Sequence, residues 1–226
     1  MNATLVIPAL DEAAVIGDLV RRVPPGVVDE VIVVDNGSLD ATSEVAAGAG
    51  ARVVREPRRG YGAACWAGVC AVSAGAEVVA FLDGDGSQAP EELAVVLEPI
   101  VSGRADFVLG ARCFAGAHPL HAVLGSRLVA RFISWRHRVH LTDIAPFRAI
   151  RLDLLRRLDM LDRAYGWPVE MVAKAAASGA RIVEVPVSHA PRQAGRSKVS
   201  GTLLGSLRAS YAFLVIAVRA SRPAAR

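Results

Sequence analysis

The sequence of 226 residues predicts an α/β fold in which helices flank a doubly wound, mostly parallel sheet. Short apolar runs rich in β-branched residues alternate with segments of helix length, and this alternation is typical of parallel sheets. Polar residues directly follow several of these runs, where the carboxyl ends of the strands would lie. Because 53% of the residues are hydrophobic, the chain can bury a sizeable core, and we expect one domain over residues 1–226.

The first half of the chain contains four expected strands, at residues 3–7, 31–34, 51–55 and 78–82. Their short length and β-branched composition favour buried parallel strands. Pro8 would end the first strand, and Asp11 could cap a helix that continues to about residue 22. Further helices are expected from Asp40 and over residues 60–74.

The second half contains three more expected strands, at residues 105–109, 143–150 and 180–187. Helices are expected from about residue 120, from Trp167, where Pro168 suits an early helical position, and over residues 199–218. The apolar end of the last helix, residues 211–218, is far shorter than the roughly 20 residues needed to cross a bilayer. Any membrane contact is therefore expected to be peripheral.

The cysteines and the N-terminus indicate a cytoplasmic protein. The three cysteines are odd in number and form no metal-ligand pattern, which argues against a disulfide framework. The chain enters its first strand without the basic start and apolar run of a signal peptide. We therefore expect a reducing compartment.

Charge is distributed unevenly along the chain. Residues 1–111 hold 7 Lys and Arg against 16 Asp and Glu, whereas residues 112–226 hold 19 against 6. This asymmetry predicts an anionic partner for the second half, either a membrane surface or nucleic acid. Nucleic acid is disfavoured because the basic segments lack the interleaved aromatic residues that stack on bases.

Two aspartates, Asp83 and Asp85, stand at the end of the expected strand 78–82 in the sequence LDGDGS. Two bare carboxylates near 4 Å apart repel each other by roughly 1 to 4 kcal/mol, so a cation between them is expected. Oxygen ligands without nearby Cys or His suit Mg²⁺ or Mn²⁺, which commonly also bind substrate phosphates. The same residues are compatible with an acidic turn that only ends a strand.

Two common nucleotide-binding motifs are missing from the sequence. The first expected strand is followed by Pro8 to Glu12 where a dinucleotide fold would have Gly-x-Gly-x-x-Gly, and no phosphate-binding Gly-x-x-x-x-Gly-Lys-Ser/Thr loop occurs. The segment RRGYG at residues 58–62 combines cationic side chains with glycines at a helix N-terminus. It could bind an anion, with Arg59 and Gly60 as candidates, or form a solvated basic turn. Arg112 is a second candidate for binding a diphosphate.

The expected helix from residue 120 is amphipathic and basic. Residues 118–140 contain no acid, and one apolar stripe is flanked by four arginines; the stripe is Leu120, Leu124, Leu128, Phe132 and Trp135, and the arginines are Arg127, Arg131, Arg136 and Arg138. Such a helix either lies on an anionic membrane or packs its stripe on the core of the protein. The irregularly spaced histidines of this segment are expected to be surface residues.

Six segments resemble the family 2 glycosyltransferases, most closely the dolichyl-phosphate mannosyl- and glucosyltransferase-like branch. They are VIPALDE at 6–12, VVDNGSLDAT at 33–42, RGYG at 59–62, LDGDGS at 82–87, TDIAPFRAI at 142–150 and GRSK at 195–198. The resemblance implies a GT-A fold that transfers a sugar, with inversion, from a nucleotide diphosphate donor. The sequence departs from the family pattern at Leu10 and Asp11, where Tyr-Asn is usual, and at Asn36, where a second aspartate is usual.

By motif position, the resemblance also implies roles for individual residues. Pro8, Leu10, Glu12 and Asp35 would line the base and ribose pocket, and Asp83 and catalytic Asp85 would hold Mg²⁺ or Mn²⁺ on the diphosphate. Asp143 and Arg148 fall in a region that faces donor or acceptor in the family, although a structural ion pair is equally compatible. Glu170 stands where many members have the catalytic base.

The acceptor decides whether a base is needed. A hydroxyl acceptor must lose a proton, and a positioned base contributes about 10²- to 10⁴-fold to such a step. A phosphate monoester, with a second pKa of about 6, is largely ionised at neutral pH and needs cations instead. Arg192, Arg196, Ser197 and Lys198 can chelate a phosphate, and the resembling branch has lipid phosphate at this segment. The segment could also be a disordered basic loop.

We therefore expect a metal-dependent inverting hexosyltransferase that uses a UDP-sugar or GDP-mannose and a polyprenyl phosphate at the cytoplasmic membrane face. Residues 1–111 would form its donor-binding half, and residues 112–226 its basic, acceptor- and membrane-facing half. One alternative is transfer to a soluble or lipid hydroxyl with Glu170 as the base. Another is a non-catalytic, membrane-associated protein that binds nucleotide sugars, which Leu10 and Asn36 favour and the intact Asp83 and Asp85 disfavour.

Overall fold

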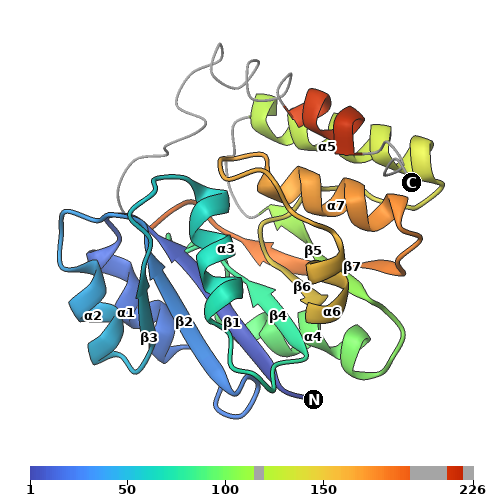
Figure 1. The fold of residues 1–226 in the computed structure, drawn as a ribbon. Coiled ribbons are helices and arrows are strands. Elements are labelled where there is room, and N and C mark those ends of the chain that lie inside the picture. The colour runs from blue at the N-terminus through green and yellow to red at the C-terminus, as the bar shows by residue number, and fades with distance from the viewer. Residues whose placement is uncertain (115–119, 194–212, 221–226) are drawn as a thin grey trace.

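The computed structural model describes residues 1–114, 120–193 and 213–220. Within these residues, seven strands form one sheet in the order β3-β2-β1-β4-β6-β5-β7 (Figure 1). β6 is antiparallel to β4 and β5, and the other neighbouring strands are parallel, which confirms the predicted mostly parallel α/β fold. The strands are β1 Ala3–Ala9, β2 Glu30–Asp35, β3 Arg52–Arg55, β4 Val78–Phe81, β5 Phe107–Phe114, β6 Arg148–Arg151 and β7 Ile182–His189.

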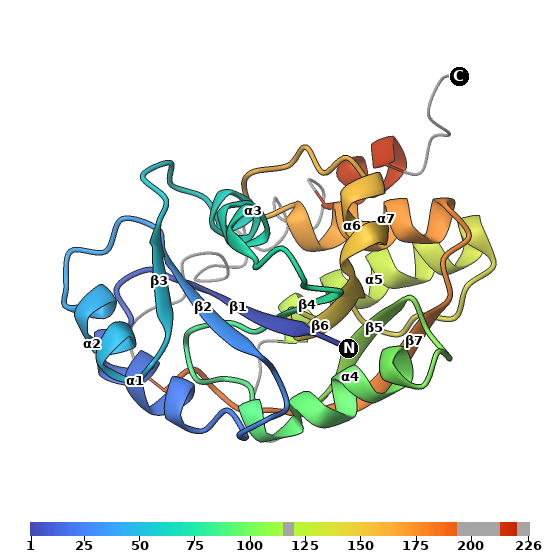
Figure 2. The same cartoon turned by 60° about the horizontal axis from the view of Figure 1, so that its bottom comes forward.

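Helices cover both faces of this sheet (Figure 2). One face carries α1 Ala13–Arg21, α2 Thr42–Gly48 and α4 Leu93–Val101, the last preceded by a 3₁₀ turn at Pro90–Glu92. The other carries α3 Tyr61–Ala71, α5 Leu120–His137, α6 Leu152–Arg157 and α7 Trp167–Ala177. Each face has its own cluster of buried apolar side chains. β4 is buried on both sides, which explains its unbroken apolar run. α4 and α6 are additional to the predicted helices.

The first strand does not end at Pro8 as expected, because β1 continues to Ala9. The Ala9 carbonyl accepts a hydrogen bond from Asn36 N on the β2 side, so the Pro8 nitrogen faces β4. Pairing between β1 and β4 has already ended at Val6 and Phe81, so the missing N–H of proline interrupts no ladder there.

β5 and β6 also differ from their predicted lengths. β5 continues past residue 109 because Gly110 lets it approach β7, where an added Cβ would lie only 2.8 Å from the Val187 side chain. β6 has four residues, Arg148–Arg151, and the preceding residues of the predicted strand 143–150 are irregular. β6 therefore contributes a short antiparallel strand between β4 and β5.

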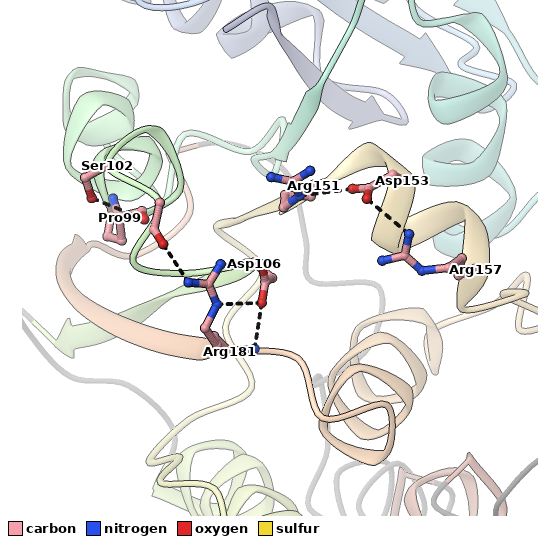
Figure 3. Close-up of polar contacts among 8 residues, drawn as sticks. Pro99, Ser102, Asp106, Arg151, Asp153, Arg157 and Arg181 are labelled. Atoms are coloured by element: carbon pink, nitrogen blue, oxygen red, sulfur yellow. Dashed lines mark hydrogen bonds and ion pairs between the residues drawn. The ribbon is translucent and has the colours of Figure 1, made fainter.

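Ion pairs connect the strands at the edge of the sheet where β5 and β7 begin. Arg181 Nη2 lies 2.7 Å from Asp106 Oδ1, and nearby Asp153 accepts from both Arg151 and Arg157 at 3.1 Å (Figure 3). The hydrogen bond from Arg181 lowers the pKa of Asp106 to about 2. These contacts lie at the end opposite to the polar clusters and hold the strands in register.

The basic helix α5 begins at Leu120 as expected, but two residues of its predicted apolar stripe face solvent. Val129, Ala130 and Ile133 are buried in the core, whereas Leu128 is 58% and Trp135 77% exposed. Phe132 is partly buried against the core. The side chains of the other stripe residues, 120 and 124, lie outside the described part of the chain.

Residues 213–220 are helical and pack against the same core cluster as α7. The rest of the predicted helix 199–218 lies outside the described residues. In the part of the chain that the structure describes, no helix is both long enough and apolar enough to span a membrane.

Candidate active site

The polar residues that the sequence placed after strands meet at one edge of the sheet. Glu12 follows β1, Asp35 ends β2, and Asp83 and Asp85 follow β4. β1 lies between β2 and β4, and Ala9 pairs with Asp35, so these carboxyl ends are aligned. Glu12 and Asp35 are buried, and Asp83 and Asp85 are partly buried. The structure thus forms an acidic site from three neighbouring strands.

Arg192 lies directly on this acidic site. Its Nη1 is 2.5 Å from Glu12 Oε1, and its Nη2 is 3.2 Å from Asp85 Oδ2. Backbone hydrogen bonds from Ala190 N to Ser87 O (2.9 Å) and from Gln193 N to Asp85 O (3.1 Å) hold the chain after β7 over the aspartate loop. A residue expected at the acceptor therefore contacts carboxylates expected at the donor, which sequence spacing alone did not indicate.

The Asp83 carboxylate is held from the interior of the protein. Its Oδ1 accepts a hydrogen bond from Tyr61 Oη at 3.0 Å, and its backbone N–H donates to Gln88 Oε1 at 3.0 Å. Burial and the neighbouring charge of Asp85 raise the pKa of Asp83 to about 6, against the opposing effects of Arg148, Tyr61 and Arg192. The charge of Asp85 thus acts on the Asp83 pKa in the direction expected for two neighbouring carboxylates, and Arg192 pairs with Asp85.

Arg148 is fully buried beneath the site, so its expected contact with the acceptor is corrected: a side chain without exposed surface cannot touch an acceptor directly. Its Nη2 donates to Tyr61 Oη at 3.1 Å, and its Nε donates to the Pro146 carbonyl at 3.1 Å. Burial, followed by the charge of Asp83, raises the pKa of Tyr61 well above its ordinary value, so this side chain is a neutral phenol. The sequence pattern indicates no separate role for Tyr61.

Asp35 is an ionised residue of the predicted base and ribose pocket. Burial acts to raise its pKa, but hydrogen bonds from Ser43 Oγ (2.5 Å) and Ser38 N (2.8 Å) outweigh burial, and the pKa lies below its ordinary value. The Glu12 backbone N–H donates to Thr42 Oγ1 at 2.9 Å. Ser38 and Thr42 lie within the motif at residues 33–42, and Ser43 directly follows it. The sequence pattern indicated no role for these three residues.

Two departures from the family pattern have structural explanations. Asp11 does not cap α1, which begins at Ala13; its φ is 53°, its N–H donates to Ser38 Oγ, and its Oδ1 accepts from Leu39 N. Asn36 donates to the carbonyls of Glu56 and Arg58 and accepts from Gly60 N. An aspartate could not make the two donated bonds. Asn36 therefore fastens the end of β2 to the following loop and is no sign of a lost function.

The interpretation of RRGYG as an anion cradle is corrected. The Gly60 N–H donates to Asn36, and the Gly62 and Ala63 N–H groups donate to the carbonyls of residues 164 and 163, so these amides are not available to a phosphate. The Arg59 side chain is exposed and donates to the Gly37 carbonyl at 3.0 Å. Of this motif, only the arginine charge remains for the donor.

Asp143 forms the structural ion pair that was one of its two interpretations, with Arg112 as the partner. Arg112 Nε is 2.6 Å from Asp143 Oδ2, and Arg112 Nη2 is 2.7 Å from Asp143 Oδ1. Burial acts to raise the pKa of Asp143, but the Arg112 hydrogen bonds outweigh it and lower the pKa. The paired fork fixes the orientation of the Arg112 guanidinium.

Glu170 is engaged by contacts within its own helix and the preceding loop. It is buried, and its carboxylate accepts from Leu161 N (3.0 Å) and Asp162 N (2.7 Å) and pairs with Lys174 Nζ (2.8 Å). These contacts give Glu170 a role in fastening the loop before α7. The remaining acceptor candidates Arg196, Ser197 and Lys198 lie outside the described residues.

The donor set of the acidic site fits a metal ion that the substrate completes. Among the described residues, no group of three or more His, Cys, Asp and Glu side chains is placed to hold a metal. Mg²⁺ is commonly bound through one or two carboxylates together with substrate phosphates, which Asp83 and Asp85 can supply. The guanidinium beside Asp85 also indicates that this place accommodates a positive charge.

A mostly parallel sheet with buried carboxylates after β1 and β2 and an Asp-x-Asp pair after β4 is typical of a glycosyltransferase of the GT-A fold. Solved structures support this class. Glucosyl-3-phosphoglycerate synthase from Mycobacterium tuberculosis, in complex with Mn²⁺, UDP and glucosyl-3-phosphoglycerate, superimposes with a TM-score of 0.77 and 25% identity over 98% of this chain and 81% of that chain. Another crystal of that synthase holds Mg²⁺ and UDP.

Residues 4–158 match the sequence model of the family described as Glycosyl transferase family 2, and the chain belongs to this family of enzymes. An uncharacterized glycosyltransferase of Mycobacterium tuberculosis is 42% identical over 212 residues, which cover 93% of this chain and 95% of the relative. Undecaprenyl-phosphate mannosyltransferase of Micrococcus luteus is 32% identical, with 91% and 90% covered. Polyprenol monophosphomannose synthase of Mycolicibacterium smegmatis is 31% identical, with 88% and 81% covered.

Proposed function

We propose that this enzyme transfers a hexose, with inversion, from a UDP-sugar or GDP-mannose to a polyprenyl phosphate at the cytoplasmic face of the membrane. It would then belong to the dolichyl-phosphate mannosyl- and glucosyltransferase-like branch of the family. The observation that carries the proposal is the position of Arg192, an expected acceptor cation, on Glu12 and Asp85 of the donor side. The two relatives whose names state a polyprenyl acceptor support the same assignment.

On the donor side, Pro8, Leu10, Glu12 and Asp35 would hold the base and ribose. Asp83 and Asp85 would hold Mg²⁺ or Mn²⁺, which when bound neutralises charge that develops on the leaving diphosphate. Arg112, oriented by Asp143, and exposed Arg59 would complete the diphosphate site. Asp143 would then act by positioning Arg112.

On the acceptor side, the attacking group would be a phosphate oxygen that is already ionised, so no base is required. The two backbone amides and Lys174 that occupy the Glu170 carboxylate support a mechanism without it. When the donor complex fills the acidic site, Arg192 would exchange its carboxylate partners for the acceptor phosphate. Arg196, Ser197 and Lys198 would add further donors to that phosphate.

A second candidate is transfer to a hydroxyl group, with Glu170 as the base. The likeness to glucosyl-3-phosphoglycerate synthase favours it, because solved structures of that enzyme hold UDP-glucose together with phosphoglyceric acid. In this candidate Glu170 would have to leave its present hydrogen bonds to reach the acceptor.

The exposed face of α5 supports peripheral membrane contact. Exposed Leu128 and Trp135 stand beside exposed arginines at 127, 131, 136 and 138, and each arginine near an anionic surface contributes about 1 kcal/mol. Replacement Trp135→Glu should weaken sedimentation with phosphatidylglycerol vesicles several-fold. Val101→Glu, at a similarly exposed position of α4 on the other face of the sheet, is the matched control. Equal vesicle binding by the two variants would contradict this surface.

The donor assignment is tested by isothermal titration of UDP-glucose and GDP-mannose, each with Mn²⁺ and with EDTA. We expect one of the two to bind, and to bind more tightly with Mn²⁺, because Asp83 and Asp85 would hold the metal ion and the ion would neutralise diphosphate charge. Absence of binding by both donors would contradict the proposal. Donor binding with the same affinity in EDTA as in Mn²⁺ would contradict the proposed role of the metal.

A further inference from the structure

Arg148 is a buried cation whose charge needs an explanation. It lies on β6 opposite Phe81 of β4, its side chain is fully buried, and its guanidinium carbon is 5.8 Å from the centre of the Phe81 ring. Within the described residues it forms no ion pair, and its Nη1 has no hydrogen-bond partner. A buried charge without such compensation is costly, so a compensating interaction at longer range is expected.

The hydrogen bond from Arg148 to Tyr61 has only one possible direction. A guanidinium can only donate, so Arg148 Nη2 donates to Tyr61 Oη at 3.1 Å. The Cys65 thiol also borders this hydroxyl. Asp83 Oδ1, at 3.0 Å, is the charged acceptor beside it, and the single hydroxyl proton of Tyr61 is directed there. The chain of donors therefore runs from Arg148 through Tyr61 to Asp83, and it presents a fixed proton to one carboxylate oxygen.

The glycines of RRGYG hold Tyr61 in this place. Gly60 has a φ of 147°, and an added Cβ would collide with the carbonyl oxygen of Arg163. An added Cβ on Gly62 would lie 2.6 Å from the Asp162 carbonyl oxygen. The two glycines thus let the first turn of α3 press against the backbone of residues 162–164, while Tyr61 between them points to Asp83. This gives the motif a function that the phosphate interpretation did not.

We propose that Tyr61 and Arg148 are positioning residues for Asp83, which they fix in one orientation for binding the metal of the donor complex. This inference rests on the proposed role of Asp83 as a metal ligand. It moves Arg148 from the acceptor to the donor site and adds Tyr61 to that site. Partners of metal ligands typically change metal affinity by about 10- to 100-fold when they are replaced.

Tyr61→Phe tests the proposal, because it removes the hydroxyl and keeps the ring. Titration of UDP and GDP should show Mn²⁺-dependent binding weakened by about 10- to 100-fold in this variant, with unchanged affinity in EDTA. The matched control is Tyr165→Phe at an exposed tyrosine, which should bind as the wild type does under both conditions. Circular dichroism and thermal unfolding establish that the variants are folded.

Arg148→Met supplies a second measurement. Where it folds, it should weaken Mn²⁺-dependent binding in the same direction, and the double variant with Tyr61→Phe should be little weaker than the single ones, because the residues act in series. Wild-type Mn²⁺-dependent affinity in Tyr61→Phe, or an equal loss in EDTA, would overturn the proposal. If the wild type itself binds neither nucleotide with Mn²⁺, the proposed function fails, and this inference fails with it.

Discussion

The two aspartates of the Asp-x-Asp pair are held from opposite sides and by different means. Asp83 is held from the interior by Tyr61, with fully buried Arg148 behind it. Asp85 is met from the outside by Arg192, whose side chain is 24% exposed and belongs to the segment after β7. The inner contacts cannot leave without disturbing the core, whereas the outer guanidinium can move into solvent.

This difference assigns different tasks to the two sides. A carboxylate fixed by buried hydrogen bonds is preorganised for a ligand, and preorganisation lowers the cost of binding. A carboxylate covered by an exchangeable cation must release it when another cation arrives. Binding of the donor complex would therefore release Arg192 from Asp85, and the freed guanidinium could then bind the acceptor phosphate.

The largest effect is expected from replacement of the outer aspartate. Asp85→Ala should abolish transfer in Mn²⁺-replete assays, because the proposed metal site loses one of its two carboxylates. Asp153→Ala, at an exposed acid of α6 that pairs with Arg151 and Arg157, should keep wild-type activity. Near wild-type turnover by Asp85→Ala would end the proposed metal role.

Replacement of the outer cation should separate acceptor from donor. Arg192→Ala should reduce kcat/KM for polyprenyl phosphate by roughly 10- to 100-fold, the value of a hydrogen bond between charged groups. Its Mn²⁺-dependent nucleotide affinity should be at least that of the wild type, because no guanidinium competes for Asp85. Arg192→Lys should restore part of the acceptor use. Equal losses of donor binding and acceptor use would contradict the proposed exchange of partners by Arg192. Arg196→Ala should likewise weaken acceptor use far more than donor binding.

A smaller effect is expected at Glu170, whose carboxylate is occupied by two backbone amides and Lys174. Glu170→Gln should leave the rate of transfer to a phosphate acceptor nearly unchanged, whereas a base for a hydroxyl acceptor would cost about 10²- to 10⁴-fold. Thermal unfolding of the variant should show some destabilisation, since the Lys174 ion pair is lost. A large rate loss in the fully folded variant would favour the hydroxyl candidate.

The smallest effect is expected at the opposite edge of the sheet. Arg181 lowers the pKa of Asp106 to about 2, so this pair stabilises the fold above the ordinary pKa of the carboxyl, and the stabilisation is lost as the pH falls through 2. Asp106→Asn should slightly lower the free energy of unfolding at neutral pH and match the wild type near pH 2 in denaturant titrations. Donor binding should not change in this variant. A change would show that the ion pairs at this edge of the sheet affect the acidic site at the opposite edge.

The sequence was sufficient for the parts of the site that depend on local geometry. Glu12, Asp35, Asp83 and Asp85 each follow a short apolar strand, and parallel pairing brings the ends of such strands to one edge. The motif Asp-x-Asp then predicted two neighbouring carboxylates. These inferences needed only the period of a strand and the rule that ligands bind at this edge.

Contacts between distant segments could not be predicted in the same way. Arg192 is separated from Glu12 by 180 positions, and Arg148 from Tyr61 by 87. Nothing in the local pattern of Asn36 indicates that its amide will fasten the loop at residues 56–60. The exposed side of α5 could not be predicted either, because Val129, Ala130 and Ile133 are buried in the core whereas Leu128 and Trp135 of the regular stripe are exposed.

The most direct test of the account is a transfer assay with two acceptors of equal chain length, a short polyprenyl phosphate and the corresponding polyprenol. The wild-type enzyme is incubated with the donor that binds, with Mn²⁺ or with EDTA, and the lipid product is detected by mass spectrometry. We predict a hexosyl phosphate lipid from the phosphate acceptor, lost with EDTA, and no product from the alcohol. Product from the alcohol alone would contradict the account and assign the base to Glu170.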